Sequence, residues 1–353
     1  MLTHEAADFP ELPLPDEIAR AEAQRLTGTL ITPNGSLGRL EELGAWIAAC
    51  QGQAPPRPFT RPRVVVFAGD HGIAANGVSA YPAGVTGQLV GATLTGGAPL
   101  NVLATVAGAT VRVVDLAVDR EGSATPEAAD LKVRRGSGSI ATEDALSDEE
   151  VHAAIQAGRT IADAEVDSGA DLLVAGEIGV ASSTPASVLV AALTGAEPVA
   201  VVGRGSGIDD NAWMRKAVAI RDGLRRARAV LADPVALLRT TAGADIAAIT
   251  GFLAQAAVRR TPVLLDGLVV GAAALVAEEL APGARNWWVA AHRSSEPAHA
   301  LVLEHLDLEP ILDLHLRVGG GSGGATALPL LTMAARVLAE TSTYEQSGVT
   351  PPK

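Results

Sequence analysis

Hydrophobic positions along the chain follow two different rhythms, and the change falls near residue 60. Between residues 37 and 50, Leu40, Leu43, Ile47 and Cys50 recur at helical spacing, which predicts an amphipathic helix. After the Pro-rich segment 54–58, short apolar runs alternate with long Ala-rich stretches. The runs cover residues 64–67, 110–114, 172–174, 199–202, 262–265, 287–289 and 311–314. Strands that alternate with helices indicate an α/β fold with a doubly wound, mostly parallel sheet and flanking helices.

Two helices have distinct start signals. Ser147 and Glu150 form a capping-box pattern ahead of the apolar Val151, so a helix should begin directly after Ser147. Thr184 followed by Pro185 predicts a second start, with the threonine hydroxyl as N-cap and the proline in the first helical position.

Composition supports this fold class. Of the 353 residues, 48% are apolar and only 3% are aromatic, which suits a helix-covered parallel sheet better than a β-sandwich. The formal net charge of −13 argues against a nucleic-acid surface, although a small anion needs only a local nest of N–H groups and a nearby cation. The single Cys50 excludes an intramolecular disulfide framework and a Cys-based zinc site, and we expect it to be a buried structural thiol.

The sequence contains no recognisable targeting signal. Residues 1–5 include an acidic side chain and lack the basic head and apolar run of a signal peptide. The most continuously apolar stretch, residues 267–277, is shorter than the ~18 residues that a membrane span needs. We therefore expect a cytoplasmic protein without a membrane partner.

Unusual loops follow five of the predicted strands. They cover residues 69–72, 176–179, 203–207, 292–297 and 319–324. In a parallel sheet, ligands bind in the crevice at the carboxyl ends of the strands, so these loops are expected to line one site.

The loop at residues 203–207 is a candidate phosphate site. Gly203, Gly205 and Gly207 would let backbone N–H groups approach an anion without interference from Cβ atoms. Lys216, about two helical turns further along, could supply the positive charge, or it could be a solvated surface lysine. The loop matches neither a Walker motif nor a dinucleotide fingerprint, so an ordinary Gly-rich turn stays equally open.

An acid and an imidazole share one tight turn at Asp70 and His71. The two side chains could serve acid–base chemistry or a metal, but no further ligand lies at metal-binding spacing, and we predict no metal site. A structural turn in which Asp70 caps nearby N–H groups is the favoured interpretation. Further along, Tyr81 could form a wall for an aromatic ligand, and Gln88 could donate to a ring nitrogen.

A polar cluster that contains His292, Ser294 and Glu296 follows the apolar run at residues 287–289. Such a cluster at a strand end is expected to be functional more often than decorative. Arg293 and Glu296 could equally form a structural ion pair that braces the loop.

Ordered motifs along nearly the whole chain resemble those of the nicotinate-nucleotide–dimethylbenzimidazole phosphoribosyltransferases. The similar segments are residues 33–41, 67–72, 77–82, 202–210, 264–267, 292–297 and 313–317, within a region from about residue 25 to about residue 335. The resemblance implies a homodimer whose subunit has a large parallel-sheet domain, residues 61–328, and a small helical domain built from residues 1–60 and 329–353. It also implies transfer of the phosphoribosyl group of nicotinate mononucleotide to an aromatic base, giving an α-riboside 5′-phosphate and nicotinate, with no metal or organic cofactor.

The same resemblance assigns residues to the two ends of the site. Ser79, Tyr81 and Gln88 would lie in or beside the pocket for the acceptor, 5,6-dimethylbenzimidazole or a related base. The phosphoribosyl group would be held by Gly203, Gly205, Ser206, Gly207, Lys216, Gly319 and Gly321. Supporting roles would fall to Asp70, His71, His292, Ser294 and Glu296.

Two loops depart from the family pattern. The family's Arg-Leu-Gly-Glu-Gly-Thr-Gly-Ala is replaced by Arg317-Val318-Gly319-Gly320-Gly321-Ser322-Gly323-Gly324, so Gly320 occupies the position of the glutamate that the family uses as general base. The family's Gly-(Asp/Glu)-Met-Gly-Ile-Gly-Asn-Thr-Thr is replaced by Gly176-Glu177-Ile178-Gly179-Val180-Ala181-Ser182-Ser183-Thr184. Glu177 is kept and is the candidate substitute base, while Gly320 would enlarge the acceptor pocket.

Two functions stay open at this point. A positioned base contributes ~10²–10⁴-fold to a rate, so its loss would leave a slow transferase or one retuned to another acceptor. Alternatively, the chain is a catalytically silent paralogue that binds a nucleotide or base as a sensor, carrier or hetero-oligomer subunit. Both functions need the same binding loops, so the sequence does not separate them.

Overall fold

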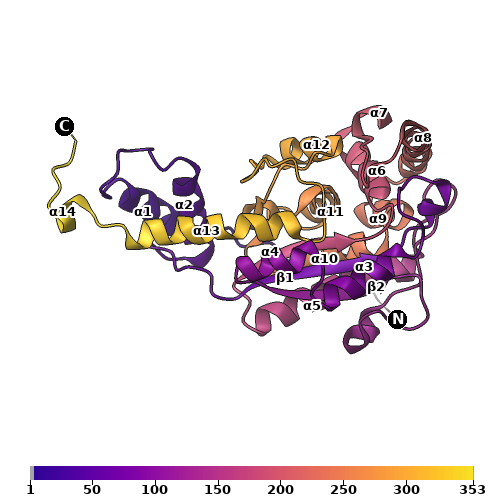
Figure 1. Ribbon diagram of the computed structural model, residues 1–353, viewed down its shortest axis with the longest axis horizontal. Helices are drawn as coiled ribbons and strands as arrows, with labels where there is room; N and C mark the ends of the chain where they lie inside the picture. Colours follow the sequence, from indigo (N-terminus) through magenta and orange to yellow (C-terminus); the bar gives the residue numbers. More distant parts are fainter. Residues whose placement is uncertain (1–3, 353) are drawn as a thin grey trace.

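A five-stranded parallel sheet forms the centre of the computed structural model, which describes residues 4–352 (Figure 1). The strands are β1 (Pro62–Gly69), β2 (Thr110–Ala117), β3 (Leu172–Ile178), β4 (Val263–Leu265) and β5 (Trp288–Ala290). They lie in the order β2-β1-β3-β4-β5, and every neighbouring pair is parallel. The predicted α/β fold is confirmed. Residues 1–3, part of the N-terminal segment that lacks the features of a signal peptide, lie outside the described residues.

Two apolar runs that were predicted to be strands are not strands. Residues 199–202 overlap the helical turn α7 (Pro198–Val201), because Pro198 favours a helix start and a four-residue apolar run fits a helix as well as a strand. Residues 311–314 lie beside β5, but the only bridge there is the isolated one between Leu312 and His292. The strand prediction is wrong for both runs.

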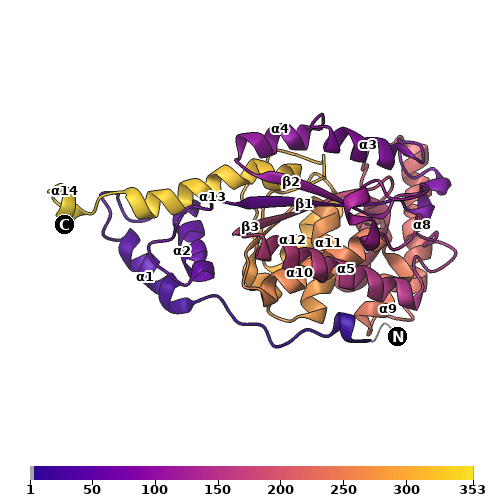
Figure 2. The ribbon, with the colours of Figure 1, turned by 90° about the horizontal axis from the view of Figure 1, so that it is seen from below.

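Helices cover both faces of the sheet. Figure 2 shows α3 and α4 on one side and α5 and α10 on the other. Alternate residues of β1 divide two cores: Val65 and Phe67 pack with α5, α10 and α11, whereas Val64 and Val66 pack with α3, α4 and α13. The helices are α1 (Glu17–Thr27), α2 (Arg39–Gln51), α3 (Val85–Leu94), α4 (Pro99–Val106), α5 (Asp148–Asp167), α6 (Ser183–Thr194), α7, α8 (Asp210–Ala227), α9 (Pro234–Thr241), α10 (Ala244–Val258), α11 (Gly267–Leu280), α12 (Pro297–Leu306), α13 (Ser322–Glu340) and α14 (Tyr344–Ser347), with 3₁₀ turns at His4–Ala7, Gly72–Asn76, Pro126–Leu131 and Ala284–Trp287.

The strand order creates a switch point between β1 and β3. From β1 the chain moves to β2 on one side and then returns to β3 on the other, so the loops that follow β1 and β3 diverge. Ligands of open parallel sheets bind in such a crevice, at the carboxyl ends of the strands. His71 follows β1 and Glu177 lies at the end of β3, so both residues stand at this crevice.

The two predicted helix starts have different outcomes. The capping box at Ser147 is confirmed: its hydroxyl accepts the Glu150 N–H at 3.1 Å, and the Glu150 carboxylate accepts the Ser147 N–H at 2.8 Å. The N-cap prediction at Thr184 is wrong, because α6 begins at Ser183 with Ser182 as N-cap. Pro185 still fits the first turn, where the backbone N–H groups have no partner within the helix.

Segments from both halves of the chain meet at one end of the molecule, where α1, α2 and the last turns of α13 lie together (Figure 1). The N-terminal turn His4–Ala7 lies at the other end of the molecule and contacts α5. An antiparallel bridge joins Leu30 to Thr343, and the Tyr344 N–H donates to the Thr29 carbonyl at 3.0 Å. α13 runs from the sheet into this helical lobe without interruption, across the predicted domain boundary at residue 329.

Cys50 on α2 forms no disulfide and is half-buried, so it is more exposed than expected. Burial raises the pKa of its thiol.

One segment, Val85–Val106, has the length and apolar composition of a membrane-crossing helix. The chain breaks this segment between Leu94 and Pro99, so it forms the two separate helices α3 and α4. Both helices contribute to the core on one face of the sheet, although only 22% of the apolar window is buried. Length and composition alone are therefore weak evidence for a span here.

Helices α5 and α10 cross at two glycines. A Cβ atom on Gly158 would lie 1.8 Å from the carbonyl oxygen of Ala248, and one on Gly251 would lie 2.2 Å from that of Ile155. Each helix thus presents a glycine to the backbone of the other. The crossing is so close that it fixes the position of α10, whose first turn carries Asp245.

Candidate active site

A cavity of about 380 Å³ opens at the carboxyl ends of the strands. This volume is in the range that holds a small organic ligand. The cavity is lined by residues from the loops after β3, β4 and β5, from the segment after β1 and from the Gly-rich loops, among them Ser79, Tyr81, Glu177, Ser182, Ser183, Gly205, Ser206, Asp266, Leu268, Val269, His292, Ser294, Glu296, Arg317, Gly319 and Gly320. Four of the five loops expected to line one site therefore do converge on this cavity, whereas the loop at residues 69–72 does not line it.

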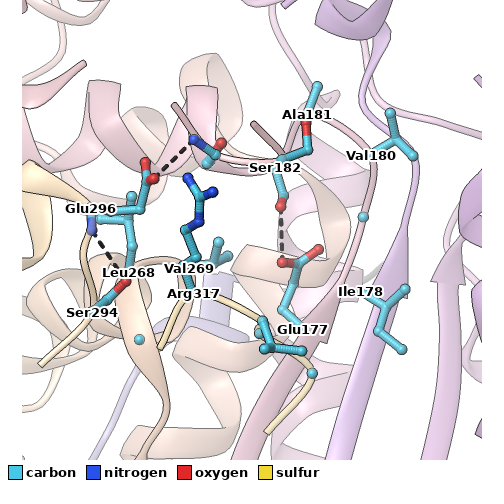
Figure 3. Close-up of a pocket in the computed structure, with 18 of the residues that line it drawn as sticks. Glu177, Ile178, Val180, Ala181, Ser182, Leu268, Val269, Ser294, Glu296 and Arg317 are labelled. Carbon is cyan, nitrogen blue, oxygen red and sulfur yellow. Dashed lines mark hydrogen bonds between the residues drawn. The ribbon is translucent and has the colours of Figure 1, made fainter. Parts of the chain in front are cut away.

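Glu177 forms part of the cavity wall and is only 8% exposed. Its Oε2 atom accepts a hydrogen bond from the Ser182 hydroxyl at 2.9 Å, as Figure 3 shows, while Oε1 has no hydrogen-bond partner among the described residues. Burial and the nearby Asp245, Asp266 and Asp70 carboxylates raise the pKa of Glu177 well above its ordinary value, against the opposing effect of Ser182. A carboxyl group of this kind is suited to exchange a proton with a ligand.

His71 has a buried carboxylate partner that lies far away in the sequence. Its Nε2 atom lies 3.1 Å from Asp245 Oδ2, and both side chains are buried. Burial opposes ionisation of the ring, but Asp245 and then Asp70 outweigh it and raise the pKa of His71. Asp70 itself accepts the Asp119 N–H at 2.8 Å, a backbone bond of the kind predicted for it. Neither Asp70 nor His71 is among the residues that line the cavity.

Asp266 fixes the glycine loop that precedes α13. Its two carboxylate oxygens accept the N–H groups of Gly321 at 2.8 Å and Gly324 at 3.1 Å, and His292 Nε2 lies 3.2 Å from Oδ1. Gly319, Gly320 and Gly321 have φ values of 74°, 66° and 86°, which few residues other than glycine adopt. The chain can therefore turn tightly here, and Gly319 and Gly320 face the cavity, whereas Gly321 lies behind them.

The neighbouring His299 holds the polar loop after β5. Burial, with a contribution from His292, lowers the pKa of His299 to about 4. The neutral ring accepts the Ser294 N–H at Nδ1, at 3.0 Å. His292 and Ser294 reach the cavity through this arrangement.

A carboxylate occupies the loop that was predicted to bind phosphate. Glu296 Oε1 accepts the Gly205 N–H at 2.8 Å, as Figure 3 shows. A Cβ atom on Gly203 would lie 1.8 Å from Glu296 Oε2, so the glycine makes room for that carboxylate. Glu296 forms no ion pair with Arg293 among the described residues, in contrast to the bracing pair considered from the sequence.

Lys216 is fully buried beneath the same loop and is not a solvated surface lysine. Its ammonium group donates to Ser183 Oγ at 2.9 Å and to the Gly203 carbonyl at 3.1 Å. Burial lowers the pKa of Lys216, against the attraction of the Glu296 carboxylate. Lys216 therefore braces the loop from behind, and it does not line the cavity.

The predicted acceptor residues are only partly brought together. Ser206 Oγ accepts the Ala80 N–H at 2.9 Å and lies 3.2 Å from Ser79 Oγ, which joins the segment after β1 to the Gly-rich loop. Ser79, Ser206 and Tyr81 all line the cavity, while Gly207 does not. Gln88 on α3 lines a second hollow beside Asp70, outside the cavity.

Arg317 is a cavity residue to which the sequence analysis gave no role. It is the one Lys or Arg among the described residues of the cavity wall, and its guanidinium points into the space between Glu296 and Ser182 (Figure 3). The useful signal was its place directly before the glycine loop. Asp245 was also missed, and it had no signal, because it lies on α10, 174 positions beyond His71.

Comparisons with known proteins agree on one family. A family model described as Phosphoribosyltransferase matches residues 12–349. The nicotinate-nucleotide–dimethylbenzimidazole phosphoribosyltransferase of Mycobacterium marinum (strain ATCC BAA-535 / M) is 60% identical over 341 residues, covering 97% of this chain and 95% of that protein. The protein of the same name from Mycobacterium tuberculosis (strain ATCC 25618 / H37Rv) is 60% identical, with 97% and 94% covered. The crystal structure of the Thermus thermophilus enzyme of this name superposes with a TM-score of 0.89 at 38% identity, covering 96% of this chain and 100% of that one.

Proposed function

The chain belongs to the nicotinate-nucleotide–dimethylbenzimidazole phosphoribosyltransferase family, and we propose that its cavity transfers the phosphoribosyl group of nicotinate mononucleotide to 5,6-dimethylbenzimidazole or a related aromatic base. The observation that carries this proposal is the cavity at the switch point of the sheet, with a buried carboxyl group in its wall that has one oxygen without a partner among the described residues. The products are an α-riboside 5′-phosphate and nicotinate.

In the proposed step, the unprotonated ring nitrogen of the acceptor attacks C1′ of the ribose. Its lone pair forms the new C1′–N bond, while the bond from C1′ to the pyridinium nitrogen breaks and leaves its electron pair on nicotinate. The acceptor ring is then cationic, and its second nitrogen loses a proton to the Glu177 carboxylate, which returns it to solvent. Attack on the face opposite the leaving group inverts C1′ and gives the α-riboside. A pyridinium leaving group needs no protonation, so one base is sufficient.

Cavity residues with free polar groups support the placement of the substrate. Arg317 can pair with the phosphate, because a guanidinium binds phosphate oxygens in a bidentate manner. Glu296 lines the cavity, although its Oε2 atom is buried against Gly203 and has no hydrogen-bond partner among the described residues. The positive charge of Lys216 attracts the Glu296 carboxylate from the buried side of the loop. This attraction reduces the repulsion between the Glu296 carboxylate and a phosphoribosyl group bound near Gly205. We assign the acceptor ring to the side of the cavity lined by Tyr81, with Ser79 and Gly320 next to it.

We further propose that the protein is cytoplasmic and forms a homodimer. Gln88 is proposed to lie beside the acceptor pocket and not inside it. Apolar side chains on the outer surface of α3 and α4 support a second copy, since Val102 is 64% exposed and Val106 is 78% exposed. The proposed domains are a small helical domain of residues 1–60 and 329–353 and a large domain of residues 61–328. The lobe of α1, α2 and the end of α13 supports the small domain, whereas the turn His4–Ala7 contacts α5 of the large domain.

The function is tested by incubating the pure protein with nicotinate mononucleotide and a panel of azole bases, with mass-spectrometric detection of nicotinate and riboside phosphates. Base-dependent release of nicotinate is the expected result and identifies the acceptor class. Calorimetric binding of the nucleotide without product from any base would contradict a transferase and support the silent paralogue instead.

Restoring a glutamate at position 320 should speed the reaction. Gly320 faces the cavity, and the nearest atom to an added Cβ would be Ile178 Cγ1 at 3.7 Å, so Gly320→Glu has room for its side chain. The φ of 66° costs about 1 kcal/mol of stability for a residue other than glycine. We expect turnover with dimethylbenzimidazole to rise about tenfold, as measured by nicotinate release at saturating substrates. Gly320→Gln is the matched control with the same backbone strain and no basic group, and an equal gain in both variants would contradict the role of the carboxylate.

A further inference from the structure

Glu177, His71 and Asp245 form a buried group of side chains at the switch point, which we call the Glu177 cluster. One polar atom from each of the three lies within 4.8 Å of the others, and the imidazole is hydrogen-bonded to Asp245 at 3.1 Å. Only Glu177 also reaches the cavity wall. The other two side chains stand behind it and cannot contact a ligand in the cavity directly.

Glycines on three loops make room for the Glu177 cluster. A Cβ atom on Gly179 would lie 2.5 Å from Glu177 Oε1 and 3.2 Å from the imidazole Nε2 atom. Cβ atoms on Gly69 and Gly243 would lie 3.0 Å and 2.4 Å from atoms of the Asp245 carboxylate. The backbone therefore closes around the cluster from three sides, so its members are held in fixed relative positions.

The hydrogen bonds of the cluster are incomplete, so one of its carboxyl groups is expected to hold a proton. Glu177 Oε1, Asp245 Oδ1 and His71 Nδ1 are buried and have no partner among the described residues. Two carboxyl groups this close in a buried site cannot both ionise at low cost, and a proton on one of them relieves the repulsion. A protonated Glu177 converts one oxygen from an acceptor into a donor.

We propose that Asp245 and His71 are positioning residues that set whether Glu177 carries its proton, an inference that rests on the proposed role of Glu177 in the transfer. Asp245 places a negative charge beside Glu177 and favours its protonated form. A protonated His71 offsets the Asp245 charge and favours the carboxylate form. The pair thus acts on the reaction through Glu177, without touching the substrate.

The groups that face Glu177 from the surrounding elements are Asp245 of α10, His71 and Asp70 after β1, Asp266 after β4 and Ser182 before α6. Burial and the three carboxylates raise the pKa of Glu177, and the hydroxyl opposes them. The base form is therefore populated only as the pH rises through this raised pKa. Consequently kcat/KM of the unaltered protein should increase as the pH rises through this raised pKa.

The test compares the pH dependence of kcat/KM in the unaltered protein, Asp245→Asn and His71→Gln. Asp245→Asn removes a negative charge that raises the pKa of Glu177, so the rising limb should move to lower pH by about one unit. His71→Gln leaves the Asp245 charge without its offset, so the limb should move to higher pH. Equal losses of plateau activity with unmoved midpoints would indicate a merely structural role and overturn the inference.

Matched variants keep the outcomes distinct. Asp163→Asn alters an ion pair with Arg259 at 2.8 Å, outside the cavity lining, and should keep the unaltered pH profile. Thermal unfolding identifies any variant that fails to fold. If Asp245→Asn does not fold, the inference is still tested by the direction in which His71→Gln shifts the pH profile. A fully active Glu177→Gln enzyme would contradict the role of Glu177 as the base, on which this inference rests, and would leave the transfer reaction itself in place. A slow Glu177→Gln enzyme, with unmoved profiles in the other two variants, would contradict only this inference. Absence of product from the unaltered protein would contradict the proposed function.

Discussion

Replacing Glu177 with Gln should lower kcat for transfer to dimethylbenzimidazole by about 10²–10⁴-fold, the usual contribution of a positioned base. Gln has nearly the same shape as Glu and can keep the 2.9 Å contact with Ser182, so the cavity should be preserved. What it lacks is the ability to take the proton from the second ring nitrogen of the acceptor. The measurement is nicotinate release at saturating concentrations of both substrates and at alkaline pH, where the carboxylate form of the unaltered protein is populated.

The KM for nicotinate mononucleotide should change much less than kcat, because a base that acts after C1′ is attacked contributes little to binding of the donor. Glu197→Gln is the matched control, since that side chain is exposed on the surface before α7 and makes no cap bond. An unchanged kcat in Glu177→Gln would show that the acceptor loses its proton to solvent, and that the chain works with no protein base.

Glu177 also shows what the sequence can and cannot reveal about the site. A carboxylate directly after a buried strand is a local signal, and the rule that loops at strand ends meet was enough to place it near the cavity. Its environment is not local. Asp245 and His71 are separated by 174 positions, and only the folding of α10 onto the sheet brings them to Glu177. The spacing of residues along the sequence therefore gives no carboxylate partner for His71.

Lys216 illustrates a different limit. Its spacing after a Gly-rich loop correctly indicated that it lies near that loop, but the sequence carries no information on which side of the loop it approaches. The structure shows that Lys216 approaches the loop from the buried side, where its ammonium group donates to Ser183 and to the Gly203 carbonyl. Arg317 is therefore the one cationic side chain in the cavity wall among the described residues. The same limit applies to residues 199–202, where four apolar residues fit a strand or a helical turn and only the tertiary fold selects the turn.

Substituting Ala for Gly158 should destabilise the protein by about 3 kcal/mol, because an added Cβ would lie 1.8 Å from the Ala248 carbonyl and the two helices would have to separate. The expected readout is a lower urea midpoint with an unchanged m-value. Gly91→Ala on α3 is the matched control. A Cβ atom there meets nothing within 4 Å, so the variant should be slightly stabilised, by about 0.5–1 kcal/mol, through helix propensity.

The same substitution should also slow the reaction beyond its effect on stability, because α10 carries Asp245 in the turn that precedes Ala248. Moving α10 away from α5 shifts Asp245 relative to Glu177, and the charge that controls the base shifts with it. Nicotinate release by Gly158→Ala, measured well below its unfolding midpoint, should therefore fall and its pH profile should move toward the acid side. A destabilised variant with an unmoved pH profile would show that the helix crossing supports the fold alone, and that the Glu177 cluster is positioned by its own loops.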